Sequence, residues 1–281
     1  MKKIVLSAFS DEYADGLIEQ CKALSEFGIG FSELRGIDGK NISELTNAQI
    51  CRVKEILNEY RIKPSAIGSP IGKISLDGDL NAHLEMAKRV FESAQQLGTN
   101  RIRVFSFYMP NGDTAEHCRG RVLAEMEKLV KLSEEYGVTL CHENEALIYG
   151  ESPERCLELA EYFGGKLRCV FDMGNFVLDG YDPKKAYGML KSYIEYFHIK
   201  DAMYAGAIVP PGAGEAKIKE IISQHSEEGE GEMLITLEPH LQTFSGLNAL
   251  VGKSFDNPYK YENREVAFCD ALARLRGLLS H

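Results

Sequence analysis

Several features that identify common protein classes are missing from this sequence of 281 residues. Its seven cysteines form no CxxC pair and are odd in number, so neither a disulfide framework nor a structural zinc motif is indicated. No apolar run approaches the roughly 18 residues that are needed to span a bilayer. Basic residues are outnumbered, 32 against 42 acidic ones, and the formal charge of −10 opposes contact with a phosphate backbone. We therefore expect neither a nucleic-acid nor a membrane partner.

The N-terminal segment also lacks the form of a signal peptide. Its apolar part is about as long as one strand and is followed at once by Asp11 and Glu12. Because the cysteines have the pattern of reduced thiols as well, the simplest expectation is a cytoplasmic protein. Hydrophobic residues make up 44% and charged residues 26% of the chain, which is typical of a globular protein and excludes disordered and collagen-like classes.

Short, β-rich apolar runs alternate with longer segments of helical periodicity along the whole chain. This alternation predicts repeated βα units on a parallel sheet. No glycine-rich phosphate loop of the GxGxxG or GxxxxGK[ST] type follows any run, which argues against an open Rossmann-like sheet. Eight units without a linker instead predict an α/β fold, a single (β/α)8 TIM barrel domain spanning residues 1–281. The predicted strands are Ile4–Phe9, Ile29–Leu34, Pro64–Gly68, Arg101–Phe105, Thr139–Glu143, Arg168–Asp172, Tyr196–Lys200 and Met233–Glu238.

The last four predicted strands each end in a residue that can bind a metal. These residues are Glu143, Asp172, His198 and Glu238, separated by 29, 26 and 40 residues, or roughly one βα unit each. Reactive side chains of a barrel gather where its strands end, so we expect the four to converge at one mouth. A single glutamate in such a place is more often a solvated or ion-paired side chain. Four consecutive strands that repeat the pattern indicate a site.

Three carboxylates and one imidazole form a hard ligand set made mostly of oxygen. Such a set suits manganese, our first choice, or magnesium, and it can also accept cobalt or zinc. A divalent ion of this kind polarises a ketone and its neighbouring hydroxyl. Two carboxylates at different strand ends could then remove and return a proton on the adjacent carbon through an enediolate. We predict that Glu143 and Glu238 are this acid/base pair.

Motifs along nearly the whole chain resemble those of the sugar phosphate isomerase/epimerase family within the xylose isomerase-like TIM barrels. They read SAFSDE, ELRGIDGKNI, IGSPIGK, RVFSFY, HENEALIYG, FDMGNF, HIKD with PPGAGE, and LEPHL. In the epimerases of that family, a Glu, Asp, His, Glu quartet binds manganese or a similar ion, and the two glutamates act as acid and base. The resemblance implies these roles for Glu143, Asp172, His198 and Glu238. It also implies a small sugar or sugar phosphate substrate and association into a homo-oligomer.

One position departs from the pattern of the family. Asn175 stands three residues after Asp172, where ketose epimerases commonly place a histidine that contacts the substrate. An amide can hold a sugar hydroxyl but cannot titrate, so the hydroxyl pattern recognised here can differ. The sequence therefore leaves open a lyase or dehydratase of the inosose or 3-keto glycoside type, which uses the same enediolate chemistry. Such an enzyme needs one more general acid, for which Lys200 and His240 are candidates.

Further polar residues near the predicted strand ends are candidates for substrate binding. Lys200 could hold a substrate oxygen, or it could pair with Asp201 beside it. Glu33 and Arg35 flank the end of the second strand, and we expect one of the two to point into the mouth, with Glu33 as an acceptor for a substrate hydroxyl. The remaining candidates are His240 and Ser69 for substrate contact and Arg103 for the wall of the pocket.

Overall fold

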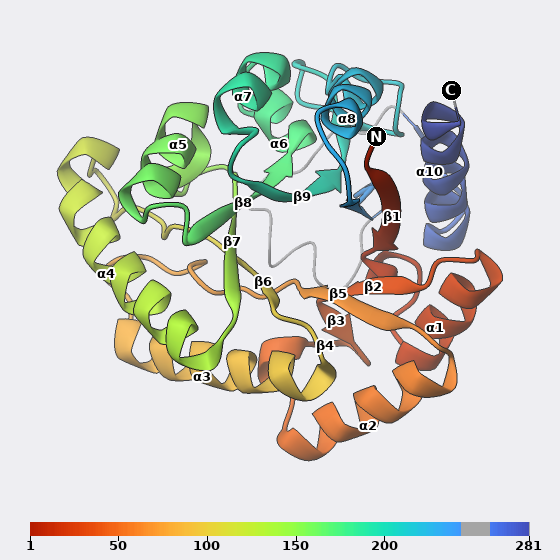
Figure 1. Ribbon diagram of the computed structural model, residues 1–281, viewed down its shortest axis with the longest axis horizontal. Coiled ribbons are helices and arrows are strands. Elements are labelled where there is room, and N and C mark those ends of the chain that lie inside the picture. Colours follow the sequence, from red (N-terminus) through yellow and green to blue (C-terminus); the bar gives the residue numbers. More distant parts are fainter. Residues whose placement is uncertain (243–258, 281) are drawn as a thin grey trace.

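Eight parallel strands form a barrel in this computed structural model, which describes residues 1–242 and 259–280. The hydrogen-bonded order of the strands is β1-β12-β9-β8-β7-β6-β5-β2, and the helices form a ring around them (Figure 1). The predicted (β/α)8 TIM barrel is confirmed. The barrel strands are β1 (Lys3–Ala8), β2 (Phe31–Leu34), β5 (Lys63–Ile67), β6 (Arg101–Val104), β7 (Thr139–Glu143), β8 (Leu167–Asp172), β9 (Ile194–Ile199) and β12 (Glu232–Leu237).

Amphipathic helices cover the outside of the barrel. In the helix of residues 80–97, the buried residues gather on the side that faces the barrel. Asp79 caps the start of this helix by accepting from Ala82 N, and Gly98 ends it at a left-handed φ of 84°. No helix among the described residues is long and apolar enough to cross a membrane. The helices are α1 (Leu17–Glu26), α2 (Asn47–Glu59), α3 (Leu80–Leu97), α4 (Ala115–Tyr136), α5 (Pro153–Tyr162), α6 (Met173–Leu178), α7 (Pro183–Leu190), α8 (Ile218–Glu227) and α10 (Arg264–Leu279), with short 3-10 turns η1 (Ser10–Glu12), η2 (Ile42–Glu44) and η3 (Tyr149–Glu151).

The barrel has a seam between β1 and β2. Within residues 1–242 and 259–280, no backbone ladder joins these strands, which stand at opposite ends of the hydrogen-bonded order. Buried serine side chains bridge the seam instead. Ser32 Oγ lies 3.0 Å from Ser10 Oγ and donates to the carbonyl of Ala8 at 3.4 Å. The barrel is therefore nearly closed, with side chains rather than main chain at one joint.

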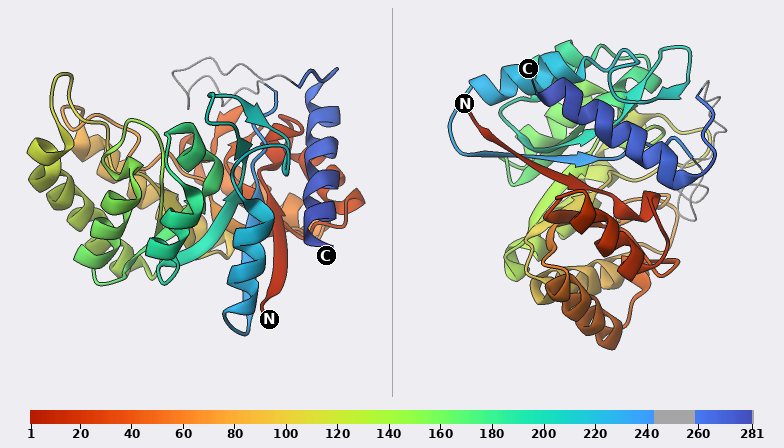
Figure 2. Two further views of the ribbon diagram at one scale, coloured as in Figure 1. Left: turned by 90° about the horizontal axis from the view of Figure 1, so that it is seen from above. Right: turned by 90° about the vertical axis from the view of Figure 1, so that its right-hand side faces the viewer.

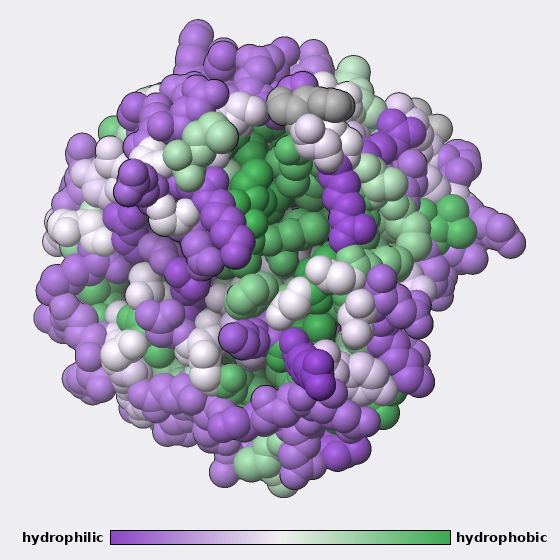
Figure 3. Space-filling model, turned by 45° about the vertical axis from the view of Figure 1, so that its right-hand side comes forward, coloured by the Kyte–Doolittle hydropathy of each residue, from purple (hydrophilic) through white to green (hydrophobic). Residues whose placement is uncertain are grey.

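Because the strands are parallel, they all finish at one end of the barrel. Figure 2 shows the barrel from the side, with the hairpin of β10 (Asp201–Ala202) and β11 (Ile208–Val209) at that end. A second hairpin, of β3 (Gly36–Ile37) and β4 (Lys40–Asn41), follows β2. Figure 3 views the molecule mainly from the opposite end, where the strands begin, and shows hydrophilic residues over most of that face, around a hollow where hydrophobic residues gather. The strand ends and the loops just beyond them are where the predicted site residues lie.

Candidate metal centre

The pairing register of the last four strands brings the predicted metal ligands together. Asp172 on β8 pairs directly with His198 on β9, and Glu143 on β7 pairs with Val170, two residues before Asp172. His198 in turn pairs with the residue of β12 that lies two before Glu238. Because alternate residues of a strand share a face, all four side chains point into the barrel.

The four side chains meet in a buried cluster that suits a divalent cation. One ligand atom of each lies within 4.8 Å of all the others. His198 Nδ1 lies 3.0 Å from Glu143 Oε1 and 3.1 Å from Glu238 Oε2. Among the described residues, Glu143 Oε2 and Glu238 Oε2 are buried without a hydrogen-bond partner, although cationic side chains lie within ion-pair distance of both. Mostly oxygen donors with one imidazole fit a hard divalent ion.

Two buried arginines contact the glutamates of this cluster. Arg35 Nη1 lies 2.7 Å from Glu238 Oε1, and Arg103 Nη1 lies 3.3 Å from Glu143 Oε2. Both guanidinium groups lie over the ring of Phe9, with their central carbons 4.0 and 5.2 Å from the ring centroid. Packing as well as charge therefore holds them in place. Arg103 lies in the wall of the cluster, where the sequence predicts it.

Lys200 and Asn175 hold the aspartate of the cluster. Lys200 Nζ donates to Asp172 Oδ2 at 2.9 Å and to Asn175 Oδ1 at 3.0 Å. The backbone N of Asn175 donates to Asp172 Oδ1 at 2.8 Å, and its Nδ2 donates to Glu143 Oε1 at 3.4 Å. Lys200 thus pairs with Asp172 at the end of the neighbouring strand rather than with Asp201 beside it. The structure places both predicted substrate residues against the predicted metal ligands, and their contact with a substrate stays a prediction.

Asp201 instead fixes a loop at the mouth. Its Oδ1 accepts from the backbone N of Ala202 at 2.9 Å and of Ala216 at 3.1 Å, and its Oδ2 accepts from Gly212 and Gly214 at 2.8 and 3.0 Å. A Cβ atom on Gly214 would lie 2.3 Å from Asp201 Oδ1, so a larger residue there would displace the carboxylate. This explains why the HIKD and PPGAGE motifs occur together, since the aspartate of the first holds the loop formed by the second.

The surrounding charges set the protonation of the cluster before any cation binds. Burial alone would raise the pKa of Glu143, but its cationic neighbours, His198 first, outweigh burial and lower the pKa to about 2. Against the same effect of burial, Lys200 and His198 hold the pKa of Glu238 well below its ordinary value. For Asp172, burial outweighs the attraction of Lys200 and raises the pKa to about 6. Both glutamates are therefore ionised at neutral pH, as metal ligands and bases must be.

The end of β2 corrects the expectation that only one of Glu33 and Arg35 points inward. Both do, because residues two apart in a strand share a face. While Arg35 reaches the cluster as described, Glu33 Oε2 lies 3.1 Å from His198 Nε2, and its Oε1 accepts from the hydroxyl of Tyr196 at 2.8 Å. The protein itself thus engages both carboxylate oxygens of Glu33. Its predicted contact with a substrate hydroxyl stays untested.

Sequence reasoning misses two acids at the mouth, Asp11 and Glu12 of η1. Both are buried, and Arg35 spans them, with Nε 2.8 Å from Asp11 Oδ2 and Nη2 3.2 Å from Glu12 Oε1. His240, a predicted substrate residue, lies beside them, with Nε2 3.3 Å from both Glu12 Oε1 and Glu238 Oε1. The two acids follow directly after β1, whose end faces the mouth, and this position could have identified them as site residues.

Ser69 is the predicted site residue whose side chain bonds only to the surrounding backbone. Its hydroxyl donates to the carbonyl of Arg103 at 2.5 Å and accepts from Ile71 N at 3.2 Å. In return, Arg103 Nη2 donates to the carbonyls of Gly68 and Ser69 at 3.2 and 3.4 Å. Ser69 therefore stabilises the strand end that carries Arg103. Its contact with a substrate stays a prediction.

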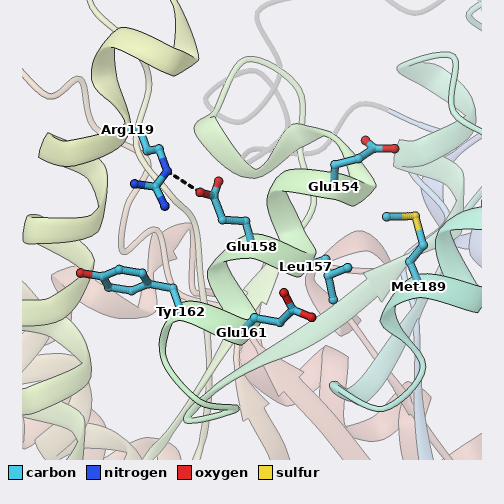
Figure 4. Close-up of a pocket in the computed structure, with 7 residues that line it drawn as sticks. All are labelled: Arg119, Glu154, Leu157, Glu158, Glu161, Tyr162 and Met189. Carbon is cyan, nitrogen blue, oxygen red and sulfur yellow. Dashed lines mark hydrogen bonds and ion pairs between the residues drawn. The ribbon is translucent and has the colours of Figure 1, made fainter.

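A second hollow lies outside the barrel, among α4, α5 and α7. Figure 4 shows Arg119 of α4 directed at Glu158 of α5, with which it forms an ion pair, and Leu157 and Met189 on the opposite side. The other glutamates that line it are exposed to solvent, unlike the buried quartet. The barrel mouth is therefore the candidate site.

A sequence model of xylose isomerase-like TIM barrels matches residues 21–251. The chain belongs to this family. Among curated protein sequences, none matches it. The match spans the region from α1 to beyond the last predicted ligand, and so includes all four residues of the buried quartet.

Solved structures within this fold superpose over nearly the whole chain. The crystal structure of a probable 3-DHS dehydratase from Bacillus anthracis, involved in petrobactin synthesis, covers 100% of both chains with a TM-score of 0.72 and 19% identity. The structure of D-psicose 3-epimerase with D-tagatose, from Clostridium cellulolyticum H10, matches 99% of this chain and 98% of its own chain, with a TM-score of 0.74 and 14% sequence identity. A xylose isomerase-like TIM barrel protein from Mycobacterium smegmatis in complex with magnesium matches 100% of this chain and 97% of its own chain, with a TM-score of 0.69 and 14% sequence identity. At such identities the likeness shows the fold.

Proposed function

We propose that this chain is a divalent-metal-dependent sugar isomerase or epimerase, which moves a proton on a carbon next to a carbonyl. The observation that carries the proposal is the pair of buried, ionised glutamates, Glu143 and Glu238, which reach one imidazole from two different strand ends. Each keeps a buried oxygen that accepts no hydrogen bond from the described residues. Two such carboxylates around one centre are what removing and returning a proton requires.

The quartet would hold the ion. Manganese is our first proposal for it, and magnesium, cobalt or zinc are the alternatives, because the donors are three carboxylates and one imidazole. When bound, the ion polarises the substrate carbonyl and stabilises the charge of the enediolate. Asp172 has no oxygen left to take a proton from a substrate, since Lys200 and Asn175 already donate to both of its oxygens through side chain and backbone. We therefore assign it to binding the ion alone.

The two glutamates would carry the proton. One of them, Glu143 or Glu238, takes it from the carbon next to the carbonyl. In an epimerase the other glutamate, which must first take up a proton from solvent, returns that proton to the opposite face of the same carbon. In an isomerase the proton goes to the former carbonyl carbon, while the proton of the neighbouring hydroxyl passes to the former carbonyl oxygen. Arg103 and Arg35, at 3.3 and 2.7 Å, orient the two carboxylates and favour their ionised forms. Nearby cations keep the pKa of both glutamates low. A glutamate that takes up a proton therefore releases it again readily, as each must do during turnover.

The substrate would be a small sugar or sugar phosphate bound at the mouth of the barrel. Asn175 and Lys200 are the strongest candidates to bind its hydroxyls, because both lie on the metal ligands. His240 lies 3.3 Å from Glu238 Oε1, which supports a contact on that side. Ser69 and Glu33 are weaker candidates, since the protein already engages their polar atoms.

As a further proposal, the chain acts as a homo-oligomer in the cytoplasm.

Solvent deuterium exchange tests the proton transfer before any product is known. The full-length protein, supplied with manganese, is incubated in D2O with a panel of ketoses, inososes, their phosphates and 3-keto glycosides, and each sugar is then weighed by mass spectrometry. We expect one sugar to gain one deuterium only with intact enzyme and metal. Glu238→Gln and Glu143→Gln are the controls, with circular dichroism to establish folding. No exchange across the panel with a metal-loaded protein would contradict the proposal.

A second candidate function, a carbon–oxygen lyase or dehydratase of inososes or 3-keto glycosides, is favoured by one observation. Lys200 Nζ lies 3.4 Å from Glu238 Oε2, so a proton donor stands beside the proposed base. Although burial opposes the charge of Lys200, the carboxylates of Asp172 and Glu238 outweigh burial and raise its pKa, which keeps it protonated. Elimination needs such an acid at the leaving group. Loss of water or of an aglycone in the exchange assay would identify this function.

A further inference from the structure

The imidazole of His198 lies between carboxylates on both of its edges. Nδ1 faces the quartet, 3.0 Å from Glu143 Oε1 and 3.1 Å from Glu238 Oε2, whereas Nε2 faces away from it, 3.1 Å from Glu33 Oε2. A neutral imidazole carries its proton on one nitrogen and a free lone pair on the other. Only the nitrogen with the lone pair can bind a cation, so the position of the proton decides whether His198 can serve as a ligand.

Glu33 can decide the position of that proton. An ionised carboxylate only accepts hydrogen bonds, and the Glu33 and His198 side chains are both fully buried, so water does not compete. Oε1 of Glu33 already accepts from Tyr196 at 2.8 Å. Oε2 therefore accepts from Nε2 and holds a proton there. Nδ1, which faces Glu143 and Glu238, is then the nitrogen whose proton a divalent ion can replace.

Aromatic rings restrict the imidazole further. The rings of Phe9 and Tyr196 lie edge-on to His198, with centroids 5.1 and 5.5 Å away. A ring flip about the Cβ–Cγ bond, which would put a carbon in place of each nitrogen, has to displace these two rings. Tyr196 lies two residues before His198 on β9 and so shares its face, which lets one strand supply both the imidazole and the hydroxyl that holds Glu33.

We propose that Glu33 is a positioning residue, held by Tyr196, which fixes the Nε2–H form of His198 and so presents Nδ1 to the divalent ion. The inference rests on the metal site of the proposed function. It differs from a substrate contact by Glu33, because both carboxylate oxygens are engaged inside the protein and the side chain is fully buried. Hydrogen-bonded carboxylates behind a metal-binding histidine typically contribute 10- to 100-fold in metal affinity.

The test measures metal binding by the full-length protein without substrate. Glu33→Gln keeps the shape and loses the charge, Glu33→Ala removes the acceptor, and Tyr196→Phe removes the hydroxyl that holds it. Competition with a chelator gives the Mn²⁺ affinity. We expect Glu33→Ala to bind Mn²⁺ about 10- to 100-fold more weakly than the wild type, with smaller losses for Glu33→Gln and Tyr196→Phe. Thermal melting establishes that each variant folds, and the isosteric Glu33→Gln keeps the test decisive if Glu33→Ala does not.

Tyr187→Phe is the matched control. Tyr187 is also a buried tyrosine whose hydroxyl contacts a histidine, His225, at 3.1 Å, but it lies outside the quartet. We expect its removal to leave the Mn²⁺ affinity unchanged. In ¹⁵N NMR of the Mg²⁺-loaded protein, His198 is expected to show a protonated Nε2 in the wild type and to lose that uniform signature in Glu33→Ala.

Two results would overturn the inference. One is an unchanged Mn²⁺ affinity in folded Glu33→Gln and Tyr196→Phe together with a raised KM, which would make Glu33 a substrate contact. The other is an NMR signature with the proton on Nδ1. A wild-type protein that binds Mn²⁺ through His198 but exchanges no deuterium would contradict only the proposed function, so the two failures are distinguishable.

Discussion

The two halves of the barrel contribute different chemistry to the mouth. The second half, from β7 to the end of β12, supplies the four residues of the quartet. The first half, β1, β2 and β6, supplies Arg35, Arg103, Glu33 and the acids of η1, which hold those residues in place. A set of ligands that can be recognised along the sequence therefore depends on a supporting set that comes from other strands.

The difference teaches how several carboxylates can be buried together. Glu143 and Glu238 stay ionised inside the protein because cations from β2, β6 and β9 lie within 2.7 to 3.4 Å of them. Without these cations, burial would favour the protonated acids, which bind metals poorly. The arginines of the first half therefore add to the charge that His198 and Lys200 of the second half already supply.

The largest effect is expected in the second half. Replacing Glu143 with Gln removes a proton carrier but keeps the hydrogen-bonding shape of the side chain. We expect deuterium exchange into the substrate to fall about 10²- to 10⁴-fold. Mass spectrometry of the exchanged sugar measures the rate, and metal content measured on the same sample separates a lost base from a lost ion. Exchange at the wild-type rate would move the acid/base role elsewhere.

In the first half, Arg35→Ala is expected to act mainly on stability. It leaves the buried carboxylates of Asp11 and Glu238 without their nearest cation. Breaking a buried ion pair from one side typically costs about 3–5 kcal/mol, and urea unfolding measures the loss. Arg52→Ala is the control, because its ion pair with Glu55 is exposed and such pairs contribute about 0–1 kcal/mol. Equal losses in both variants would show that Arg35 does not support the cluster.

Removing the metal is expected to lower the stability of the whole barrel by less than Arg35→Ala does. An ion at about 100 times its Kd stabilises the folded state by about 2.7 kcal/mol, and a chelator removes this contribution. Thermal melting with and without manganese measures the difference. Asp172→Asn retains an acceptor for the backbone N of Asn175 and loses the charge, so we expect its melting temperature to respond little to the metal. A full metal-dependent shift in that variant would place the ion outside the quartet.

The smallest effect concerns a histidine outside both sets. Lys2 Nζ donates to His225 Nε2 at 2.7 Å, so His225 is neutral, and burial followed by the charge of Lys2 lowers its pKa to about 4. The unfolded chain, with an ordinary histidine pKa near 6.5, binds more protons between these values. The stability from His225 is therefore complete above about pH 6.5 and is lost as pH falls toward 4.

Urea unfolding at pH 7 and pH 5 tests this pH dependence. His225→Gln should lose less stability between the two pH values than the wild type does, since glutamine does not titrate. The exchange activity per folded molecule should be unaffected, because His225 touches Tyr187 and Lys2 rather than the quartet. An identical pH response in both proteins would show that other groups account for it.

The fold and the clustering of the four residues could be predicted from the sequence because each depends on a local pattern. Strand runs, helical stripes and one metal-capable residue at each of four strand ends can be read from order and spacing. The barrel then brings these ends together, whatever the details of packing. This is why Glu143, Asp172, His198 and Glu238, far apart along the chain, were found to share one cluster.

The supporting set could not be predicted in the same way. Whether Lys200 pairs with Asp201 or with Asp172, and whether Glu33 faces a substrate or His198, depends on side-chain distances between strands. Asp11 and Glu12 look like surface acids in the sequence, and only the position of Arg35 shows that they are buried counterions. Partner choice among charged groups is a property of the assembled barrel.

The ion pairs of Arg35 cross the seam between β1 and β2. Arg35 stands at the end of β2, while its partners Asp11 and Glu238 follow β1 and β12, on the other side of the seam. The ion pairs therefore span the one joint where serine side chains replace the backbone ladder. Amide hydrogens along this joint are expected to exchange early in native-state hydrogen exchange, through openings far smaller than global unfolding. Each such opening would also separate Arg35 from Glu238, so breathing of the barrel and transient loss of the site would be one event.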